Sequence, residues 1–215
     1  LNLMQRLPLS MRTQLKQLVD RLKRLPDRNE DRIAFHRRAI EHANDEKTAV
    51  DALLRAVEEL DCDALAILVT ALQDSRPRVR EIAALHLGRL GDPVAAPTLM
   101  KQLHRESVVA VQAAILNALG QLGATSAVEA LIAAVQRVEL RRAAILALAR
   151  IGTADAIESL KNFRQEFALP GDSRDLGGVK LIDFVFSPRF KEQEASLKRL
   201  RKRARIFPDA PRPQR

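Results

Sequence analysis

The sequence has 215 residues, a formal net charge of +9 and a hydrophobic fraction of 47%, which is enough apolar material for a core in one or two domains. It has no apolar run of about 18 residues, which excludes a membrane-spanning helix. Cys62 is its one cysteine, which excludes an internal disulfide and a CxxC pair. We therefore expect a cytoplasmic protein, and because the sequence begins with Leu1 rather than Met, a fragment or processed form.

The positive charge is concentrated in two stretches, residues 1–40 and 169–215, whereas residues 41–73 are acidic. A helical array that binds nucleic acid would be expected to carry basic residues along its whole groove. This distribution therefore favours nucleic-acid binding less than a uniformly basic chain would.

Two capping helices are predicted in residues 1–44. The first begins after the candidate N-cap Ser10 and ends before Pro26. Its apolar residues share one face, because they are three or four positions apart: Met11, Leu15, Leu18, Leu22 and Leu25. The second covers about residues 30–43, with Ile33 and Ile40 directed inward. A coiled-coil partner helix is the alternative for the first of these segments.

A repeat of about thirty residues organises residues 45–166. The segment Leu87-Gly88-Arg89-Leu90-Gly91 returns as Leu119-Gly120-Gln121-Leu122-Gly123, and its end returns as Ala149-Arg150-Ile151-Gly152. Other apolar columns keep the same spacing: Val79, Val111 and Leu140; Ala83, Ile115 and Ala144; Leu87, Leu119 and Leu148; Leu99, Leu131 and Leu160. We predict four stacked helical hairpins, with Gly91, Gly123 and Gly152 in the turns and with Leu119 and Leu122 fully buried.

The predicted helices of the first hairpin contain Ala49 to Leu60 and Leu65 to Leu68, with Asp61-Cys62-Asp63 between them. The other three hairpins are predicted to pair residues 77–90 with 93–104, 107–122 with 125–136, and 138–151 with 153–166. A single hairpin would leave one apolar face exposed, so we expect the hairpins to stack.

The repeat pattern stops near Phe167. Residues 167–186 are predicted to form a loop followed by a short strand or extended segment, VKLIDFVF at 179–186, anchored by Phe184 and Phe186. A basic helix is predicted over residues 187–206, followed by a proline-rich tail at 207–215. The apolar stripe of this helix is predicted to cover the end or flank of the fourth repeat: Phe190, Leu197, Leu200 and Ala204.

The pattern of the second hairpin resembles HEAT-like repeats of the phycobilisome-lyase (PBS-lyase) type. The residues that carry it are Asp74, Val79-Arg80, Ala83-Ala84, Leu87-Gly88, Leu90-Gly91-Asp92-Pro93, Ala96, Leu99 and Leu103. The resemblance implies an all-α fold, a right-handed α-solenoid of about four HEAT-like hairpins with N-terminal capping helices and a C-terminal extension. Relatives of this type include bilin lyase subunits and scaffolds, so the fold does not determine the function.

In such repeats, an arginine after the valine commonly bonds an acidic turn residue of the preceding repeat. The resemblance therefore implies a structural role for Arg80, with Asp61 or Asp63 as its partner, and for Arg141. The third repeat departs from this pattern, because Gln112 stands in the arginine column.

The sequence contains no recognisable catalytic constellation. It lacks HExxH, Walker and GxSxG motifs, and His36, His42, His86 and His104 are not followed by the glutamates that a diiron site on repeats would need. We expect surface histidines, with His86 half-buried, and a small core or turn thiol at Cys62. We therefore predict no catalytic residue, no cofactor and no metal ligand, and we leave enzymatic activity uncertain, leaning against it.

These observations favour a non-enzymatic protein-interaction scaffold. Its ligand is predicted to lie on the ridge of successive second helices, at Lys101, His104, Gln136, Arg137, Lys161 and Arg164. The predicted partner is a protein with an acidic surface, also contacted by Lys198, Arg199, Lys202 and Arg203. The alternatives are a subunit of a bilin lyase or a chromophore-protein chaperone, and a nucleic-acid-binding module that uses the basic terminal segments.

Overall fold

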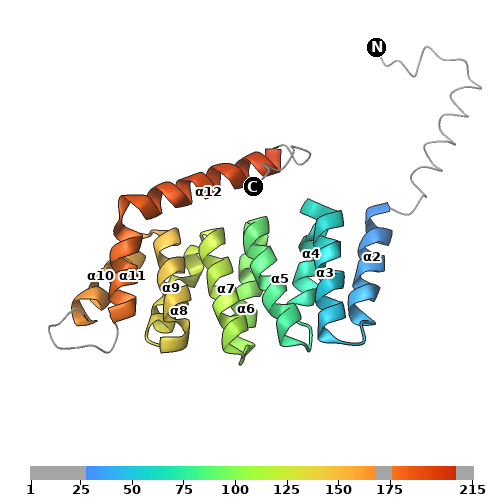
Figure 1. Cartoon of the computed structure of the whole chain (residues 1–215), viewed down its shortest axis with the longest axis horizontal. Helices are drawn as coiled ribbons and strands as arrows, with labels where there is room; N and C mark the ends of the chain where they lie inside the picture. The colour runs from blue at the N-terminus through green and yellow to red at the C-terminus, as the bar shows by residue number, and fades with distance from the viewer. Residues whose placement is uncertain (1–27, 168–175, 207–215) are drawn as a thin grey trace, which may run out of the picture. The chain divides into compact units, whose positions relative to one another are not determined.

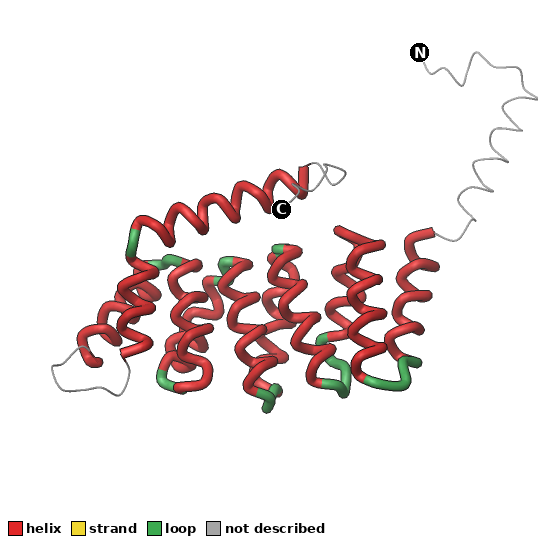
Figure 2. Tube along the Cα trace, viewed as in Figure 1, coloured by secondary structure: helices red, strands yellow, loops and turns green. Residues whose placement is uncertain are grey.

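The computed structural model describes residues 28–167 and 176–206. Every regular element in these residues is helical, with eleven α-helices and three short 3₁₀ helices (Figure 2). None of the described helices is both long and apolar enough to cross a bilayer. The predicted first helix, the proline-rich tail and most of the predicted loop lie outside the described residues.

The chain divides into two compact units, and the first of them ends at Ala64. Its described part contains α2 (Arg28–Glu41), α3 (Glu46–Leu60) and the 3₁₀ turn η2 (Asp61–Ala64). Helix α3 begins where the Asp45 carboxylate accepts a hydrogen bond from the Thr48 main-chain N–H at 2.7 Å. It packs against α2, and its buried residues share one face: Ala49, Leu53, Ala56 and Leu60.

The second unit, from Leu65 onward, holds the predicted second, third and fourth hairpins. Its helices are α4 (Leu65–Ala71), α5 (Pro77–Leu90), η3 (Pro93–Ala95), α6 (Ala96–Arg105), α7 (Val109–Leu122), η4 (Thr125–Ala127), α8 (Val128–Val135), α9 (Val138–Ile151), α10 (Ala154–Phe167), α11 (Leu176–Phe186) and α12 (Pro188–Ile206). The predicted helix pairs agree with these bounds to within a few residues, except that each of the predicted second helices of the second and third hairpins begins with a 3₁₀ turn.

The second unit is built on a row of first helices. Helix α7 packs between α5 and α9, and Figure 1 shows these three side by side, with α6 and α8 behind them. All four predicted apolar columns are buried, and Leu119 in the middle of the row is 0% exposed. The repeat spacing therefore predicts the core correctly, because each column returns to the same helix face in successive hairpins.

Leu122 differs from the prediction, because it is only half-buried. It is the last residue of α7, and Gly123 then turns the chain with φ of +67°, as Gly91 and Gly152 do in their turns. This left-handed conformation strains residues that carry a Cβ, which explains why glycine closes each first helix.

Two glycines inside the row allow the helices to approach closely. A Cβ built on Gly120 would lie 2.5 Å from the Cα of Ala147 in α9, and one on Gly88 would lie 2.8 Å from the Cα of Ala118 in α7. The Leu-Gly pairs of the repeat therefore have a packing role on the helix face that meets the next repeat.

Residues 179–186 form part of helix α11 rather than a strand or extended segment. Gly178, Ile182 and Val185 are buried at helical spacing, where α11 packs on α9 and α10. Helix α11, which comes before the predicted basic helix, therefore covers the fourth hairpin. Phe184 is 43% exposed and stacks edge-on against Phe190, so it does not anchor the segment in the core as predicted.

Helix α12 agrees with the predicted basic helix and runs back from α11 along the ends of the row (Figure 1). Phe190 is buried, and Arg150 of α9 donates to the Glu194 carboxylate at 2.9 Å. The side chains of Leu197 and Leu200 and of all residues after Leu200 lie outside the described part of the structure. The covering face predicted for them stays a prediction.

Candidate functional site

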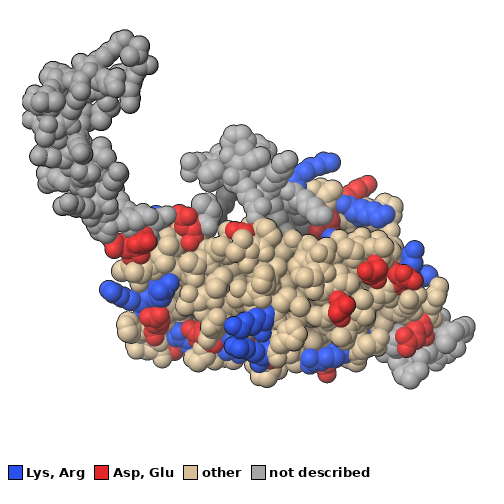
Figure 3. All heavy atoms as spheres, turned by 180° about the vertical axis from the view of Figure 1, so that it is seen from behind, with Lys and Arg blue, Asp and Glu red and all other residues tan. Residues whose placement is uncertain are grey.

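The predicted ridge consists of the second helices α6, α8 and α10. All six predicted ridge residues are exposed at or just beyond these helices: Lys101, His104, Gln136, Arg137, Lys161 and Arg164. Figure 3 views the molecule from behind, the side on which Figure 1 places α6 and α8, and both positive and negative side chains are visible there. The structure does not gather the six residues into one site, because four of them line three separate clefts and His104 and Arg137 line none of these.

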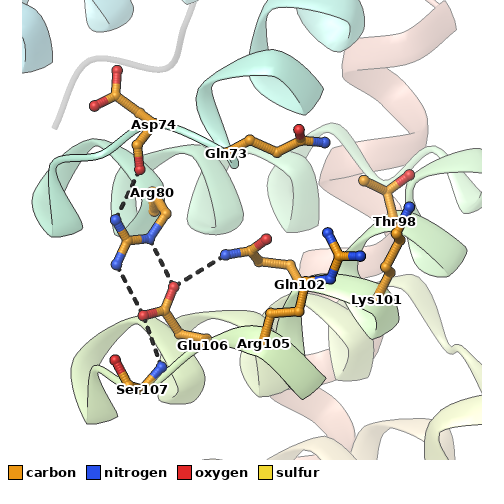
Figure 4. A pocket seen from close by; sticks show the side chains of 9 residues that line it. All are labelled: Gln73, Asp74, Arg80, Thr98, Lys101, Gln102, Arg105, Glu106 and Ser107. Atoms are coloured by element: carbon orange, nitrogen blue, oxygen red, sulfur yellow. Dashed lines mark hydrogen bonds and ion pairs between the residues drawn. The ribbon is translucent and has the colours of Figure 1, made fainter.

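The first of these, which we name the α6 cleft, has a volume of about 370 Å³. It lies between the turn after α4 and the outer side of α6, as Figure 4 shows. Its lining is polar throughout and consists of Gln73, Asp74, Arg80, Thr98, Lys101, Gln102, Arg105, Glu106 and Ser107.

An ion pair between Arg80 and Glu106 forms one wall of the α6 cleft. The Arg80 Nε and Nη2 atoms donate to the two Glu106 carboxylate oxygens at 2.7 and 2.9 Å, a bidentate arrangement (Figure 4). The Glu106 side chain is 2% exposed and also accepts from Gln102 and from the main-chain N–H of Val108. These donors, Arg80 first among them, lower the pKa of Glu106 from 4.5 to about 2 against the opposing effect of burial.

The sequence directed attention to Asp61 or Asp63 as the partner of Arg80, in the repeat before it. The structure places the Glu106 carboxylate, 26 positions further along the chain, against Arg80. The side chain of Asp61 lies outside the described residues, so the contact with the preceding repeat stays a prediction. The remaining Arg80 donor, Nη1, binds the main-chain carbonyls of Asp74 and Ser75 at 2.8 and 2.9 Å. Arg80 therefore connects the turn that precedes its own helix to the turn of the next repeat.

The arginine column repeats this contact in the second, third and fourth hairpins. Arg80, Gln112 and Arg141 each donate to the main-chain carbonyl six positions earlier, at 2.8, 2.6 and 2.8 Å. Gln112 thus replaces the arginine without loss of the carbonyl contact, and its own Oε1 accepts from Arg137 at 3.1 Å. These contacts close the connections between successive hairpins and hold the α6 cleft in a defined shape.

Lys101 and Arg105 are the exposed cations of the α6 cleft. They stand four positions apart on α6, so they lie on the same helix face. Neither has a hydrogen-bond or ion-pair partner within the described residues. The other charged lining residues are neutralised internally, because Asp74 is paired with Arg76 at 2.7 Å and Arg80 with Glu106. The cleft therefore offers two uncompensated positive charges to a ligand.

The second cleft, which we name the α8–α10 groove, has the opposite charge. Its volume is about 350 Å³, and its lining consists of Ile132, Val135, Gln136, Asp155, Glu158, Ser159, Asn162, Phe163 and Glu166. The three carboxylates are exposed, and no cationic residue lines the groove. Phe163 is buried below them, and the Arg141 guanidinium lies 5.2 Å from its ring centre.

Several predicted ridge residues already bind other parts of this chain. His104 Nδ1 lies 2.7 Å from the Met100 carbonyl, and Arg164 Nε donates to Asp183 of α11 at 2.6 Å beside Lys161. Of the basic residues predicted on α12, Arg199 is exposed, and the side chains of Lys198, Lys202 and Arg203 lie outside the described residues.

The histidines belong to no metal-binding cluster in the described residues, where no group of three or more potential metal ligands is found. His42 and His104 are exposed, and His86 is half-buried, where burial and Arg89 lower its pKa. His36 differs from the prediction of a surface residue, because it is 4% exposed and its Nε2 lies 3.1 Å from the Glu59 carboxylate. The packing of α2 on α3 buries it.

Sequence reasoning missed Glu106 and Arg105, which shape the α6 cleft. The repeat contained a signal for Glu106, since it occupies in the third repeat the place that Asp74 occupies in the second. An acidic residue six positions before the column in both the second and the third repeat, Asp74 and Glu106, indicates a recurring turn contact, which the fourth repeat does not share because Val135 stands there. Arg105 carries no such signal, because only the position of the α4 turn makes it part of a cleft.

The depressed pKa of Glu106 predicts an acid-sensitive contribution to stability. Because the folded pKa of about 2 lies below the ordinary 4.5, the contribution is present above pH 4.5 and is lost as the pH falls from 4.5 through 2. Its upper bound is roughly 3 kcal/mol, and we expect Glu106→Gln to cost about 2 kcal/mol at pH 7. Urea unfolding of the native protein and of the Glu106→Gln variant between pH 7 and pH 3 measures this contribution to the free energy of unfolding.

The variant should show a flatter dependence of unfolding free energy on pH than the native protein. Glu81→Gln is the matched control, because Glu81 pairs with the exposed Arg78 within α5 and contributes little to folding. If the two variants have the same pH dependence as the native protein, Glu106 does not carry the acid sensitivity.

Comparison with known families is consistent with this geometry. The family model of HEAT repeats matches residues 15–110 and 96–166, which together cover more than half of the sequence. No curated protein matches the sequence of this chain. Stacked helical hairpins, glycine-closed first helices and the matched residues show that this chain belongs to the HEAT-repeat family.

Proposed function

We propose that this chain is a non-enzymatic protein-interaction scaffold whose ligand lies along the ridge of α6, α8 and α10. The observation that carries the proposal is the α6 cleft, in which two exposed cations of α6, unpaired within the described residues, share the lining with the Arg80–Glu106 pair. HEAT repeats generally serve as protein-interaction scaffolds, which supports the same conclusion. The uncompensated positive charge favours a partner with an acidic surface.

Site-specific photo-crosslinking tests this proposal. A photoreactive amino acid placed at the exposed Ala133 of α8 should capture a partner from cells of the source, because this position lies on the ridge. The same group at Arg142, exposed on the first helix α9, is the control. A partner captured equally well from both positions, or turnover of a small substrate by the purified chain, would overturn the ridge as the binding surface.

The basic half of α12 is proposed as a second contact with an acidic partner. We expect the combined change of Lys198, Arg199, Lys202 and Arg203 to glutamine to weaken partner binding about tenfold, with a change of less than about 0.5 kcal/mol in unfolding free energy. Binding of the captured partner and thermal unfolding measure the two effects separately. Unchanged binding would make these residues an ordinary solvated face, and an equal loss of stability would indicate that their side chains pack on the array.

The finer assignment to PBS-lyase type repeats is also a proposal. It is supported by the shared carbonyl contacts of Arg80 and Arg141. A bilin lyase subunit would change the absorption spectrum of an open-chain tetrapyrrole on mixing, whereas a scaffold without a chromophore site would leave the spectrum unchanged.

A further inference from the structure

Two clefts of opposite charge lie on the same ridge. The α6 cleft carries the unpaired cations Lys101 and Arg105, and the α8–α10 groove carries Asp155, Glu158 and Glu166. Helix α8 forms one wall of the groove, with Ile132, Val135 and Gln136, and presents the small side chain of Ala133 to solvent. A ligand that follows the ridge from α6 to α10 therefore meets positive charge first and negative charge second.

The distance between the two clefts suits a short peptide. Neighbouring packed helices lie about 8–10 Å apart, so two steps along the ridge span roughly 16–20 Å. An extended chain covers that distance in about five or six residues, at some 3.3 Å each. A single segment of a partner can thus contact both clefts.

The sign change also determines which anions the ridge disfavours. A nucleic acid or a long acidic segment carries negative charge along its whole length, so its continuation past α8 would meet the three carboxylates of the α8–α10 groove. Like charges placed opposite one another reduce affinity and exclude incorrect partners.

We propose, resting on the scaffold function above, that the α6 cleft receives the carboxylates of a short acidic stretch in a partner segment whose continuation over α8 and α10 is neutral or basic. Lys101 and Arg105 bind the acidic stretch, with Thr98 beside them in the cleft lining. The α8–α10 groove selects the continuation, since a lysine or arginine there would lie beside exposed carboxylates above the apolar residues Ile132 and Phe163.

Three fluorescein-labelled peptides test the proposal on the full chain. The mixed peptide has three glutamates, a Gly/Ser spacer of about five residues and three arginines, a spacing that follows from the extended-chain rise. The acidic peptide replaces the arginines with glutamates, and the neutral-ended peptide replaces them with serines. We expect the mixed peptide to bind at least about tenfold more tightly than the acidic one at low salt, with the neutral-ended peptide between them.

Charge variants assign the effect to the two clefts. Lys101→Glu with Arg105→Glu should abolish the binding of all three peptides. Arg89→Glu with Arg142→Glu changes the net charge equally on exposed positions of α5 and α9, and should leave the order of the peptides unchanged. A triple variant that neutralises the groove should remove the preference for the mixed peptide over the acidic one, so that the two bind equally tightly. Its substitutions are Asp155→Asn, Glu158→Gln and Glu166→Gln.

Several results would overturn the proposal. The proposal is wrong if the acidic peptide binds the native chain as tightly as the mixed peptide does. It is also wrong if the mixed peptide shows no detectable binding. Equal losses in the Lys101/Arg105 variant and its charge-matched control would reduce the effect to net charge. Salt-sensitive dimers in sedimentation that disappear in both cleft variants would assign the clefts to a second copy of this chain. The crosslinking from Ala133 tests the scaffold function independently, so none of these results decides that function.

Discussion

Replacing Leu119 by alanine is expected to lower the free energy of unfolding by about 2–5 kcal/mol, measured by urea denaturation. Leu119 is 0% exposed on α7, the helix that packs between α5 and α9. The variant loses the burial of the leucine side chain, and it also leaves a cavity that two neighbouring helices hold open.

Leu122→Ala is the matched control, because it removes the same atoms three positions later on the same helix. Leu122 is half-buried at the end of α7, so we expect a cost below about 1.5 kcal/mol. Since repeats are coupled through their neighbours, Leu119→Ala should also increase amide hydrogen exchange in α5 and α9. A loss below about 0.5 kcal/mol for Leu119→Ala would contradict the burial of this helix face.

Gly120→Ala is expected to destabilise the fold by about 3 kcal/mol, although alanine is the better helix former by about 1 kcal/mol. The added Cβ would lie 2.5 Å from the Cα and 2.7 Å from the Cβ of Ala147, so α7 and α9 must move apart. Backbone atoms cannot rotate away as the end of a flexible side chain can, which makes this overlap costly.

Two companion variants separate the causes. Ala147→Gly in the Gly120→Ala background removes the overlap with the methyl group of residue 147 but keeps the overlap with its backbone, so we expect only partial recovery of stability. Gly123→Ala meets no atom within 4 Å and carries only the strain of its φ of +67°, about 1–2 kcal/mol. A Gly120→Ala protein as stable as the native one in thermal unfolding would show that the helices are free to separate.

Much of the array is predictable from the sequence, because its determinants are local and periodic. Apolar residues at helical spacing identify the buried face of each helix, and their return after about thirty residues identifies the stacked hairpins. Glycine at positions 91, 123 and 152 marks the ends of the first helices, since the left-handed turn there favours a residue without Cβ. The exposure of the six ridge residues follows from the same periodicity.

Helix α11 shows where this reasoning fails. The run VKLIDFVF is short and apolar, and such a run fits a strand and a buried helix equally well. Packing on α9 and α10 decides in favour of the helix, because Ile182 and Val185 then enter the same interface. Leu122 is a related case, since its column predicts burial but it is only half-buried at the last position of α7, before the Gly123 turn.

The candidate site depended on tertiary structure more than the fold did. The sequence by itself determined which helices have a solvent face and which arginines recur in the turns. Only the folded chain brings Arg80 against Glu106, 26 residues away, and places Lys101 and Arg105 in the same cleft, where no carboxylate of the described residues pairs with them. The distance between helices, rather than the separation in sequence, decides which charges on successive repeats come close together. The opposite signs of the α6 cleft and the α8–α10 groove are therefore seen only in the folded structure.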